Sequence, residues 1–220
     1  MKLLPVSFLL AAFATSAFAD LTLSQKIEQE GQTQGDQIIT LKIKDGKVRV
    51  DAGPQVSTII EIKTGDMETL MHDRKMIMAV PGVMVKAMQK MAQQTLDGNT
   101  GKVEAPKATG RKETINGYAC EEYETTTNGS KVTMWLTKDL PEAESMLNQM
   151  ATLSPESNIY AGMGDKAAVS GFPMRSTMVD ANGKVTSVTV VGLSQDPLPA
   201  ADFSAPSGYK RMATPTMPER

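Results

Sequence analysis

The chain has 220 residues, of which 40% are hydrophobic and 5% aromatic, and this length is enough for one globular domain. Its 23 basic and 25 acidic residues nearly balance and form no block of one sign, so no nucleic-acid partner is expected. The single cysteine excludes a disulfide within the chain, and stability must therefore come from packing.

The first nineteen residues are typical of an export signal. Lys2 provides a positive start, residues 3–13 are largely apolar, and small residues precede the expected cleavage site after Ala19, with cleavage after Ala17 as the alternative. The apolar stretch is too short to span a bilayer, and no stop-transfer segment follows it. No cysteine follows Ala19, so no lipid anchor is expected. These features predict an unanchored protein of the bacterial periplasm that does not span a membrane.

Turn signals predict that residues 20–209 form a single domain built on a meander of antiparallel strands. Pairs that favour tight hairpin turns separate the β-rich runs, and they are Asp45-Gly46, Asn116-Gly117, Asn128-Gly129 and Asn182-Gly183. The predicted strands, about eleven in number, cover residues 21–27, 39–43, 47–51, 56–63, 67–72, 76–80, 109–115, 118–127, 131–138, 172–180 and 184–193.

Two segments have the periodicity of helices. Residues 82–95 place Met84, Met88 and Met91 on one helical face. Residues 141–153 follow a capping pattern and carry an apolar stripe of Ala143, Met146, Leu147 and Met150. We expect both helices to lie across one face of the sheet. The remaining segments are predicted as loops (97–108 and 155–170) and as a flexible C-terminal tail (210–220).

Four segments together resemble a known group of exported bacterial proteins. They are GYACEEYE (117–124), VTMWLTKDLP (132–141), GFPMR (171–175) and LPAADFSAPSGY (198–209). Their order is similar to that of an uncharacterised family, a domain of unknown function, within the LolA-like superfamily of periplasmic lipoprotein carriers. The resemblance implies an α+β fold, mainly antiparallel β: a curved, open half-barrel with helices covering its concave face, where the carriers shelter acyl chains. No functional residue of the carriers has a motif match here, so none is transferred.

Methionine clustering is the sharpest local signal for binding. The chain has 16 methionines, and seven of them fall between Met67 and Met91. Methionine lines surfaces that accept variable apolar ligands, although it also fills irregular gaps, and a methionine stripe is equally what a covering helix needs for packing. The candidate ligand-binding residues are Met84, Met88, Met91, Met134, Trp135, Met146 and Met150.

Few side chains in the sequence could form a metal site, and its one thiol is a poor candidate for a reactive group. His72 is the only histidine, and its neighbours Met71 and Met76 invite a copper site. Met71 and His72 would point to opposite faces of a strand, however, so no metal site is predicted and no cofactor is expected. Cys120 precedes two glutamates that disfavour a thiolate, and it is predicted as a packing residue.

The sequence offers little for catalysis. It has neither a Gly-x-Ser-x-Gly nor a His-Glu-x-x-His motif, and the acidic run Glu121, Glu122 and Glu124 is typical of a solvated strand face. We therefore expect a soluble, non-catalytic periplasmic protein that holds a lipid or a lipoprotein acyl chain between sheet and helices. The alternative is an interaction module with a filled core that binds another envelope protein, and soft-metal binding is the third possibility.

Overall fold

The computed structural model describes residues 20–31, 36–96, 104–127, 129–140 and 171–212, together with Ala143 and Leu147. The strands are β1 (Leu21–Gln29), β2 (Gln37–Lys44), β3 (Lys47–Ala52), β4 (Val56–Glu61), β5 (Met67–Met71), β6 (Met76–Val80), β7 (Lys107–Ile115), β8 (Tyr118–Thr127), β9 (Ser130–Thr137), β10 (Phe172–Val179), β11 (Val185–Ser194) and β12 (Lys210–Arg211). The helices described in full are α1 (Gly82–Leu96) and the short 3-10 helix η2 (Ala200–Phe203).

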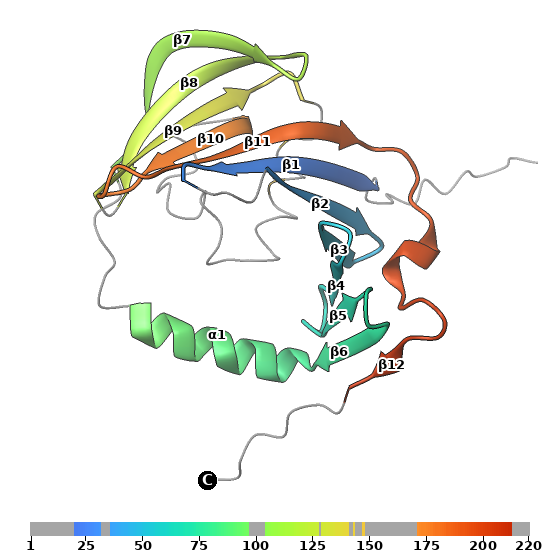
Figure 1. Ribbon diagram of the computed structural model, residues 1–220. Helices are drawn as coiled ribbons and strands as arrows, with labels where there is room; N and C mark the ends of the chain where they lie inside the picture. The colour runs from blue at the N-terminus through green and yellow to red at the C-terminus, as the bar shows by residue number, and fades with distance from the viewer. Residues whose placement is uncertain are drawn as a thin grey trace, which may run out of the picture.

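All twelve described strands belong to one sheet, in the order β12-β6-β5-β4-β3-β2-β1-β11-β10-β9-β8-β7. Two antiparallel meanders, β1 to β6 and β7 to β11, are joined where β1 pairs with β11. Only β12 is parallel to its neighbour, β6. Figure 1 shows that the sheet curves into an open half-barrel, which confirms the predicted fold class of the sheet.

The predicted strands are all present, and their ends move by at most two residues. Two of the predicted hairpin turns have the left-handed backbone that such turns require. Asp45 and Gly46 have φ values of 46° and 73°, and Asn116 and Gly117 have values of 49° and 83°. Local turn chemistry therefore fixed the register of these hairpins.

Sheet order puts the strands before and after α1 in the chain far apart. Strand β6 is next to the short β12 at one end of the sheet, and β7 forms the opposite edge. Figure 1 shows α1 on the concave side of the half-barrel. Its 15 residues span about 22 Å at 1.5 Å per residue.

The N-terminus of α1 is fixed to the loop between β4 and β5. The N–H of Gly82 donates to Asp66 Oδ1 at 2.7 Å, and Thr64 Oγ1 donates to Asp66 Oδ2 at 2.8 Å. These hydrogen bonds hold the pKa of Asp66 below its usual value. A β-carbon at Gly82 would lie only 2.1 Å from the carbonyl oxygen of Thr64, so this close approach requires glycine.

The second predicted helix, residues 141–153, lies outside the described residues except for Ala143 and Leu147. Both of these residues are helical and half-buried, and both pack against the main hydrophobic cluster. The predicted loop at 155–170 and residues 97–103 of the other predicted loop also lie outside the described residues.

The two faces of β1 to β6 bury different clusters. Leu21 lies opposite Ile43 and Ile43 lies opposite Val48, so these buried residues of the main cluster share one face. Residues of the C-terminal segment pack against the cluster on the other face. Figure 1 shows this segment outside the curve of the sheet and α1 inside it, so the face of the main cluster is the concave one. The convex face buries a smaller cluster of Ile59, Leu70 and Ile77.

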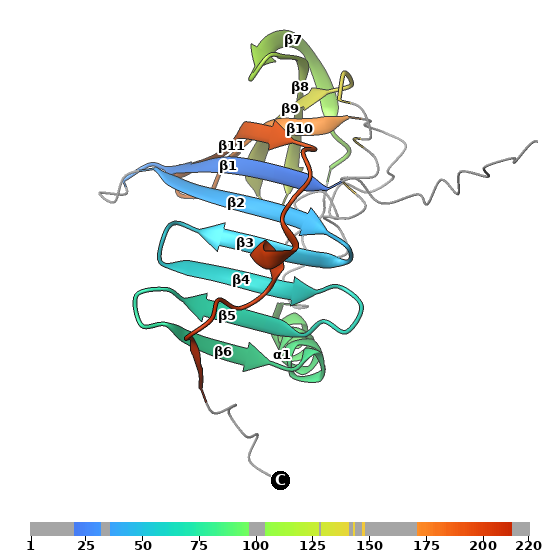
Figure 2. The ribbon, with the colours of Figure 1, turned by 90° about the vertical axis from the view of Figure 1, so that its right-hand side faces the viewer.

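A C-terminal strap, residues 195–212, crosses the convex face of β3 to β6 (Figure 2). Lys42 Nζ contacts Asp202 Oδ2 at 2.7 Å, and Arg49 Nη1 donates to the carbonyl oxygen of Asp202 at 2.8 Å. The strap ends in β12, so Lys210 and Arg211, assigned by sequence to the start of the flexible tail, pair with β6 instead. Residues 213–220 lie outside the described residues.

Asp20 ties the start of the sheet to the strap. Its Oδ2 accepts hydrogen bonds from the N–H of Leu198 at 2.6 Å and from Lys44 Nζ at 2.7 Å. Both contacts favour the charged carboxylate, so the pKa of Asp20 is lowered, and the same ion pair raises the pKa of Lys44.

Replacing Gly82 with alanine is expected to destabilise the protein by about 1–3 kcal/mol, because the new methyl group meets the backbone of Thr64 and Gly65. Thermal or urea unfolding measures the change. Gly192→Ala is the control, since its β-carbon would approach Ser24 Cβ only to 3.4 Å, an ordinary contact. Equal stability of the two variants would contradict the described position of α1.

Asp20→Asn is expected to lower the free energy of unfolding at pH 7 by about 1–3 kcal/mol, because hydrogen bonds to the charged carboxylate are lost. A lowered pKa stabilises the fold above the unfolded-state value of about 3.9, and this stabilisation disappears as pH falls through the folded-state pKa. The difference between wild type and variant should therefore shrink in acid. Asp45→Asn, whose side chain is 79% exposed, should change little at either pH. A wild-type–variant difference that does not depend on pH would contradict this role of Asp20.

Candidate functional site

Four methionines of β5 and β6 lie on one face of the sheet. Met71 lies directly opposite Met76, and Met78 lies opposite Thr69, one step further along the pair. Met67, at the other end of β5, lies opposite Val80. Residues directly opposite in an antiparallel pair, and residues two apart along a strand, share a face. We call Met67, Met71, Met76 and Met78 the methionine patch.

The methionine patch is on the concave face. Val48 belongs to the main cluster and lies opposite Ile60, which in turn lies opposite Met67. This ladder of opposite residues carries the concave face from the centre of the sheet to its β6 end. All four patch methionines are half-buried. The concave face therefore ends in flexible thioether side chains that remain partly accessible.

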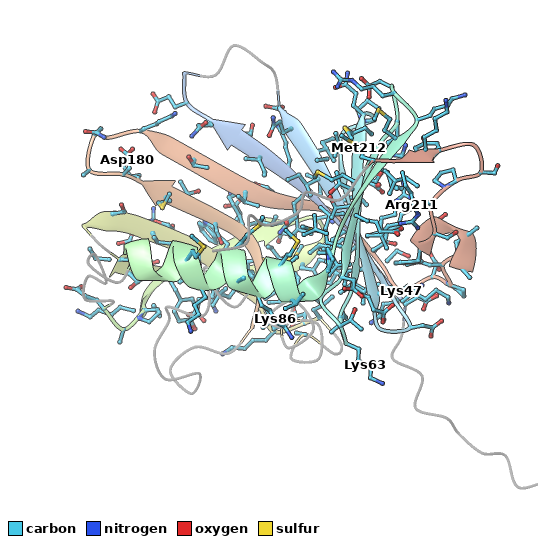
Figure 3. All side chains as sticks on the ribbon, turned by 90° about the horizontal axis from the view of Figure 1, so that it is seen from below. Lys47, Lys63, Lys86, Asp180, Arg211 and Met212 are labelled. Carbon is cyan, nitrogen blue, oxygen red and sulfur yellow. The ribbon has the colours of Figure 1, made fainter. Side chains whose placement is uncertain are left out.

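Helix α1 adds an apolar stripe next to this patch. Met84 is half-buried, but Val83, Met88 and Met91 are 75%, 58% and 64% exposed. Figure 3 views the helix from below, with Lys86 labelled. The predicted helix is thus present on the concave side. Its methionine stripe was expected to lie between helix and sheet, but Met88 and Met91 are largely exposed. The first turn of the helix is held by Asp66 and Gly82, and Val83, Met88 and Met91 further along it are exposed.

The structure separates Met134 from Trp135, although the sequence analysis grouped them in one ligand site. Both belong to β9, where neighbouring residues point to opposite faces. Met134 is 2% exposed and lies opposite Tyr123 and Ser176, whereas Trp135 packs against the main cluster. Met146 and Met150 lie outside the described residues. Of the predicted ligand residues, the structure brings together only the three of α1.

The four patch methionines belong to the run of seven between Met67 and Met91 but are not among the candidate binding residues predicted from the sequence. Strand alternation could have found them, because Met67 and Met71 are four residues apart and Met76 and Met78 are two apart. Their common face is decided by the pairing of β5 with β6, which depends on the length of the turn between these strands.

His72 is part of a polar network that locks the strap to the convex face. Its Nε2 lies 2.7 Å from Ser57 Oγ, and its Nδ1 lies 2.7 Å from the hydroxyl of Tyr209. Ser57 is 1% exposed, donates to Asp51 Oδ1 at 2.5 Å and accepts from Arg49 Nη2 at 2.9 Å. His72 is therefore a structural residue with both ring nitrogens engaged.

Proton counting argues against a nucleophilic role for Ser57. The single hydroxyl proton goes to Asp51, so the Ser57 oxygen accepts from Arg49 and from His72. His72 then acts as a donor to the serine and does not withdraw its proton, as a general base would. The strap also covers Ser57 and His72 through Tyr209, so their hydrogen bonds serve to hold the strap on the sheet.

Cys120 and Glu122 are buried on β8, at 3% and 2% exposure. Burial raises the pKa of the Cys120 thiol, which disfavours the reactive thiolate. Glu122 accepts hydrogen bonds from Thr109 at 2.7 Å and from Arg111, which holds the carboxylate against the irregular strand β7. Glu122 is thus a paired structural charge, and it does not belong to a solvated face as the sequence suggested.

Two negative observations apply to the part of the chain that is described. No group of three or more His, Cys, Asp and Glu side chains there could hold a metal ion. None of the helices described is long and apolar enough to cross a membrane.

Ser57→Ala is expected to destabilise the fold by about 1–3 kcal/mol, because Asp51, Arg49 and His72 lose a buried partner. Tyr209→Phe should cost about 1 kcal/mol, since one hydrogen bond is lost while the ring remains. A double-mutant cycle measured by urea unfolding should give a coupling of about 0.5 kcal/mol or more between them, carried by His72. The control cycle combines Ser57→Ala with Tyr123→Phe. The Tyr123 hydroxyl bonds to Glu121, outside this network, so the two changes in unfolding free energy should be additive. Additivity in both cycles would contradict the network.

Comparison with known proteins gives a family and distant structural likenesses. The family described as "Domain of unknown function (DUF4412)" matches residues 23–209. No curated protein matches the chain. Two crystal structures of PNGF-II are 14% identical with a TM-score of 0.38, and the match covers 87% and 88% of this chain but only 30% and 31% of PNGF-II. The LolA superfamily protein NE2245 from Nitrosomonas europaea is 14% identical with a TM-score of 0.31, over 84% of this chain and 89% of that one. The family match over most of its length shows that this chain belongs to the DUF4412 family, in agreement with the uncharacterised family expected from the sequence.

Proposed function

We propose that this protein is an exported, non-catalytic binding protein that holds an apolar ligand, a lipid or a lipoprotein acyl chain, on its concave face. One observation carries the proposal: the methionine patch and the α1 stripe present partly or fully exposed apolar side chains on the same side of the sheet. Exposed apolar side chains that cluster in this way indicate a binding surface.

The chemistry of these side chains fits a ligand of variable shape. Methionine is unbranched and polarizable, so it adapts to ligands that differ in length or branching. Each methylene of an acyl chain that leaves water contributes about 0.8 kcal/mol, so burial of even part of a chain gives useful affinity. On α1, Met84 is half-buried, and Met88 and Met91 one and two turns further along are exposed.

The cellular location is part of the same proposal. Residues 1–19 have the pattern of an export signal, and we infer cleavage after Ala19 and delivery to the periplasm. Asp20 would then be the first residue of the mature chain, and its carboxylate already bonds to Lys44 and Leu198. An unanchored carrier in that compartment can shelter an apolar group from water.

A second candidate function is a protein-interaction module. Leu140, Ala143 and Leu147 already pack into the main cluster, so the central part of the concave face is filled by the chain itself. The long edge strand β7 is exposed along nearly its whole length and could pair with a strand of another envelope protein. This candidate predicts no lipid binding.

Binding of a fluorescent long-chain fatty acid to the purified protein tests the first candidate, together with mass spectrometry of lipids extracted from protein isolated from its native envelope. Met78→Gln and Met88→Gln should each weaken probe binding by about tenfold, since each removes apolar contact worth about 1.4 kcal/mol. Ile38→Gln is the matched control, because Ile38 is 53% exposed but lies on the convex face, opposite Lys26.

Absence of both a co-purifying lipid and probe binding would reject the apolar-ligand function and favour the interaction module. Equal loss of probe binding in Ile38→Gln would also reject it, because the binding would then be a general property of exposed apolar residues. Circular dichroism of each variant verifies that the fold is intact.

A further inference from the structure

The methionine patch places four thioether side chains on neighbouring positions of one sheet face. Met71 and Met76 are directly opposite, and the β-carbons of such a pair are about 4.5–5.5 Å apart. Met78 is diagonal to Met71, and diagonal neighbours are about 7–8 Å apart. Met78 is also diagonal to Met67 on its other side. Met78 is thus the centre of the patch, with a donor on each side along β5.

These side chains have the length and the accessibility that a shared ligand would need. A methionine sulfur is separated from the β-carbon by one methylene, and rotation about two side-chain bonds moves it, so sulfurs on adjacent positions can converge. All four residues are half-buried, so their sulfurs are neither sealed in the core nor freely solvated. Thioether donors are neutral and soft, and among biological metals they select Cu(I).

The structure removes the objection that the sequence raised against a copper site. That earlier possibility combined Met71 and Met76 with His72, whose ring would point to the opposite face. His72 does lie on the other side, where Ser57 and Tyr209 engage both ring nitrogens. The pairing of β5 with β6 supplies Met78 instead, on the same face as Met71 and Met76. The donor set is therefore composed of sulfur alone.

We propose that Met71, Met76 and Met78 bind one soft monovalent cation, Cu(I), through their thioether sulfurs, with Met67 positioned as a fourth donor. This site goes beyond the proposed binding of an apolar ligand and does not depend on it, because coordination needs only the four side chains of β5 and β6. Ag(I) has the same charge and softness, does not change oxidation state in air, and serves as the probe.

Titration of the purified protein with Ag(I), followed by calorimetry and native mass spectrometry, tests the site. One equivalent is expected to bind. Met71→Leu, Met76→Leu and Met78→Leu should each weaken binding by at least about tenfold, or about 1.4 kcal/mol. Leucine conserves volume and apolar character, so these variants are expected to fold. Met178→Leu, on the exposed part of β10, and His72→Ala should bind as the wild type does.

A measurement on the unmutated protein avoids dependence on variant folding. In protein labelled with ¹³C at the methionine methyl groups, Ag(I) should shift the resonances of Met71, Met76 and Met78 and leave that of Met178 unchanged. No stoichiometric binding, equal loss in Met178→Leu, or loss in His72→Ala would each overturn the proposal. Fatty-acid probe binding is measured separately on the same protein, so failure of the metal site and failure of the proposed function give different results.

Discussion

The pairing of β1 with β11 is the contact on which the rest of the structure depends. It joins two antiparallel meanders into one sheet, although the residues that meet, such as Leu23 and Leu193, are far apart in sequence. The register shifts between Ser24 and Gln25 at this junction, and such bulges increase the twist and bend of a sheet. The same pairing puts β6 and β7 near opposite ends of the sheet. Helix α1 follows β6 in the chain and lies on the concave side of the sheet (Figure 1).

The two faces of β1 to β6 have different chemistry because different parts of the chain cover them. The strap seals the convex face with ion pairs and with the Ser57–His72–Tyr209 network, so the polar residues there are satisfied and structural. The concave face near β6 has no comparable cover among the described residues. It keeps half-buried methionines, and α1 adds exposed ones. Histidine and serine, the usual candidates for function, are thus used for stability here, while apolar and sulfur-containing side chains are left available.

Helix α1 is attached to the loop between β4 and β5 by contacts of its first residue. Asp66 accepts the N–H of Gly82, and the missing side chain of Gly82 allows the backbone of Thr64 to approach closely. Beyond this point Met88 and Met91 are exposed. The first turn of the helix is thus the part with described hydrogen bonds to the sheet, while its methionine stripe stays accessible to solvent.

Local sequence determined the strands and the hairpins, because alternation and Asn-Gly or Asp-Gly turns act over a few residues, as Asp45-Gly46 and Asn116-Gly117 demonstrate. It also indicated α1 and the concentration of methionine. Strand pairing decided which methionines share a face. Met134 and Trp135 are neighbours in sequence but face opposite sides, whereas the pairing of β5 with β6 places Met71, Met76 and Met78 on one face. The hydrogen-bond partners of His72 and the short parallel strand β12 could not be predicted from the sequence either. Tyr209 and Lys210 reach their positions only when the strap crosses the folded sheet. Contacts of the strap join residues far apart in sequence and leave no local pattern, so only the tertiary structure decides them, whereas the methionine patch comes from a single hairpin whose alternation is visible in the sequence.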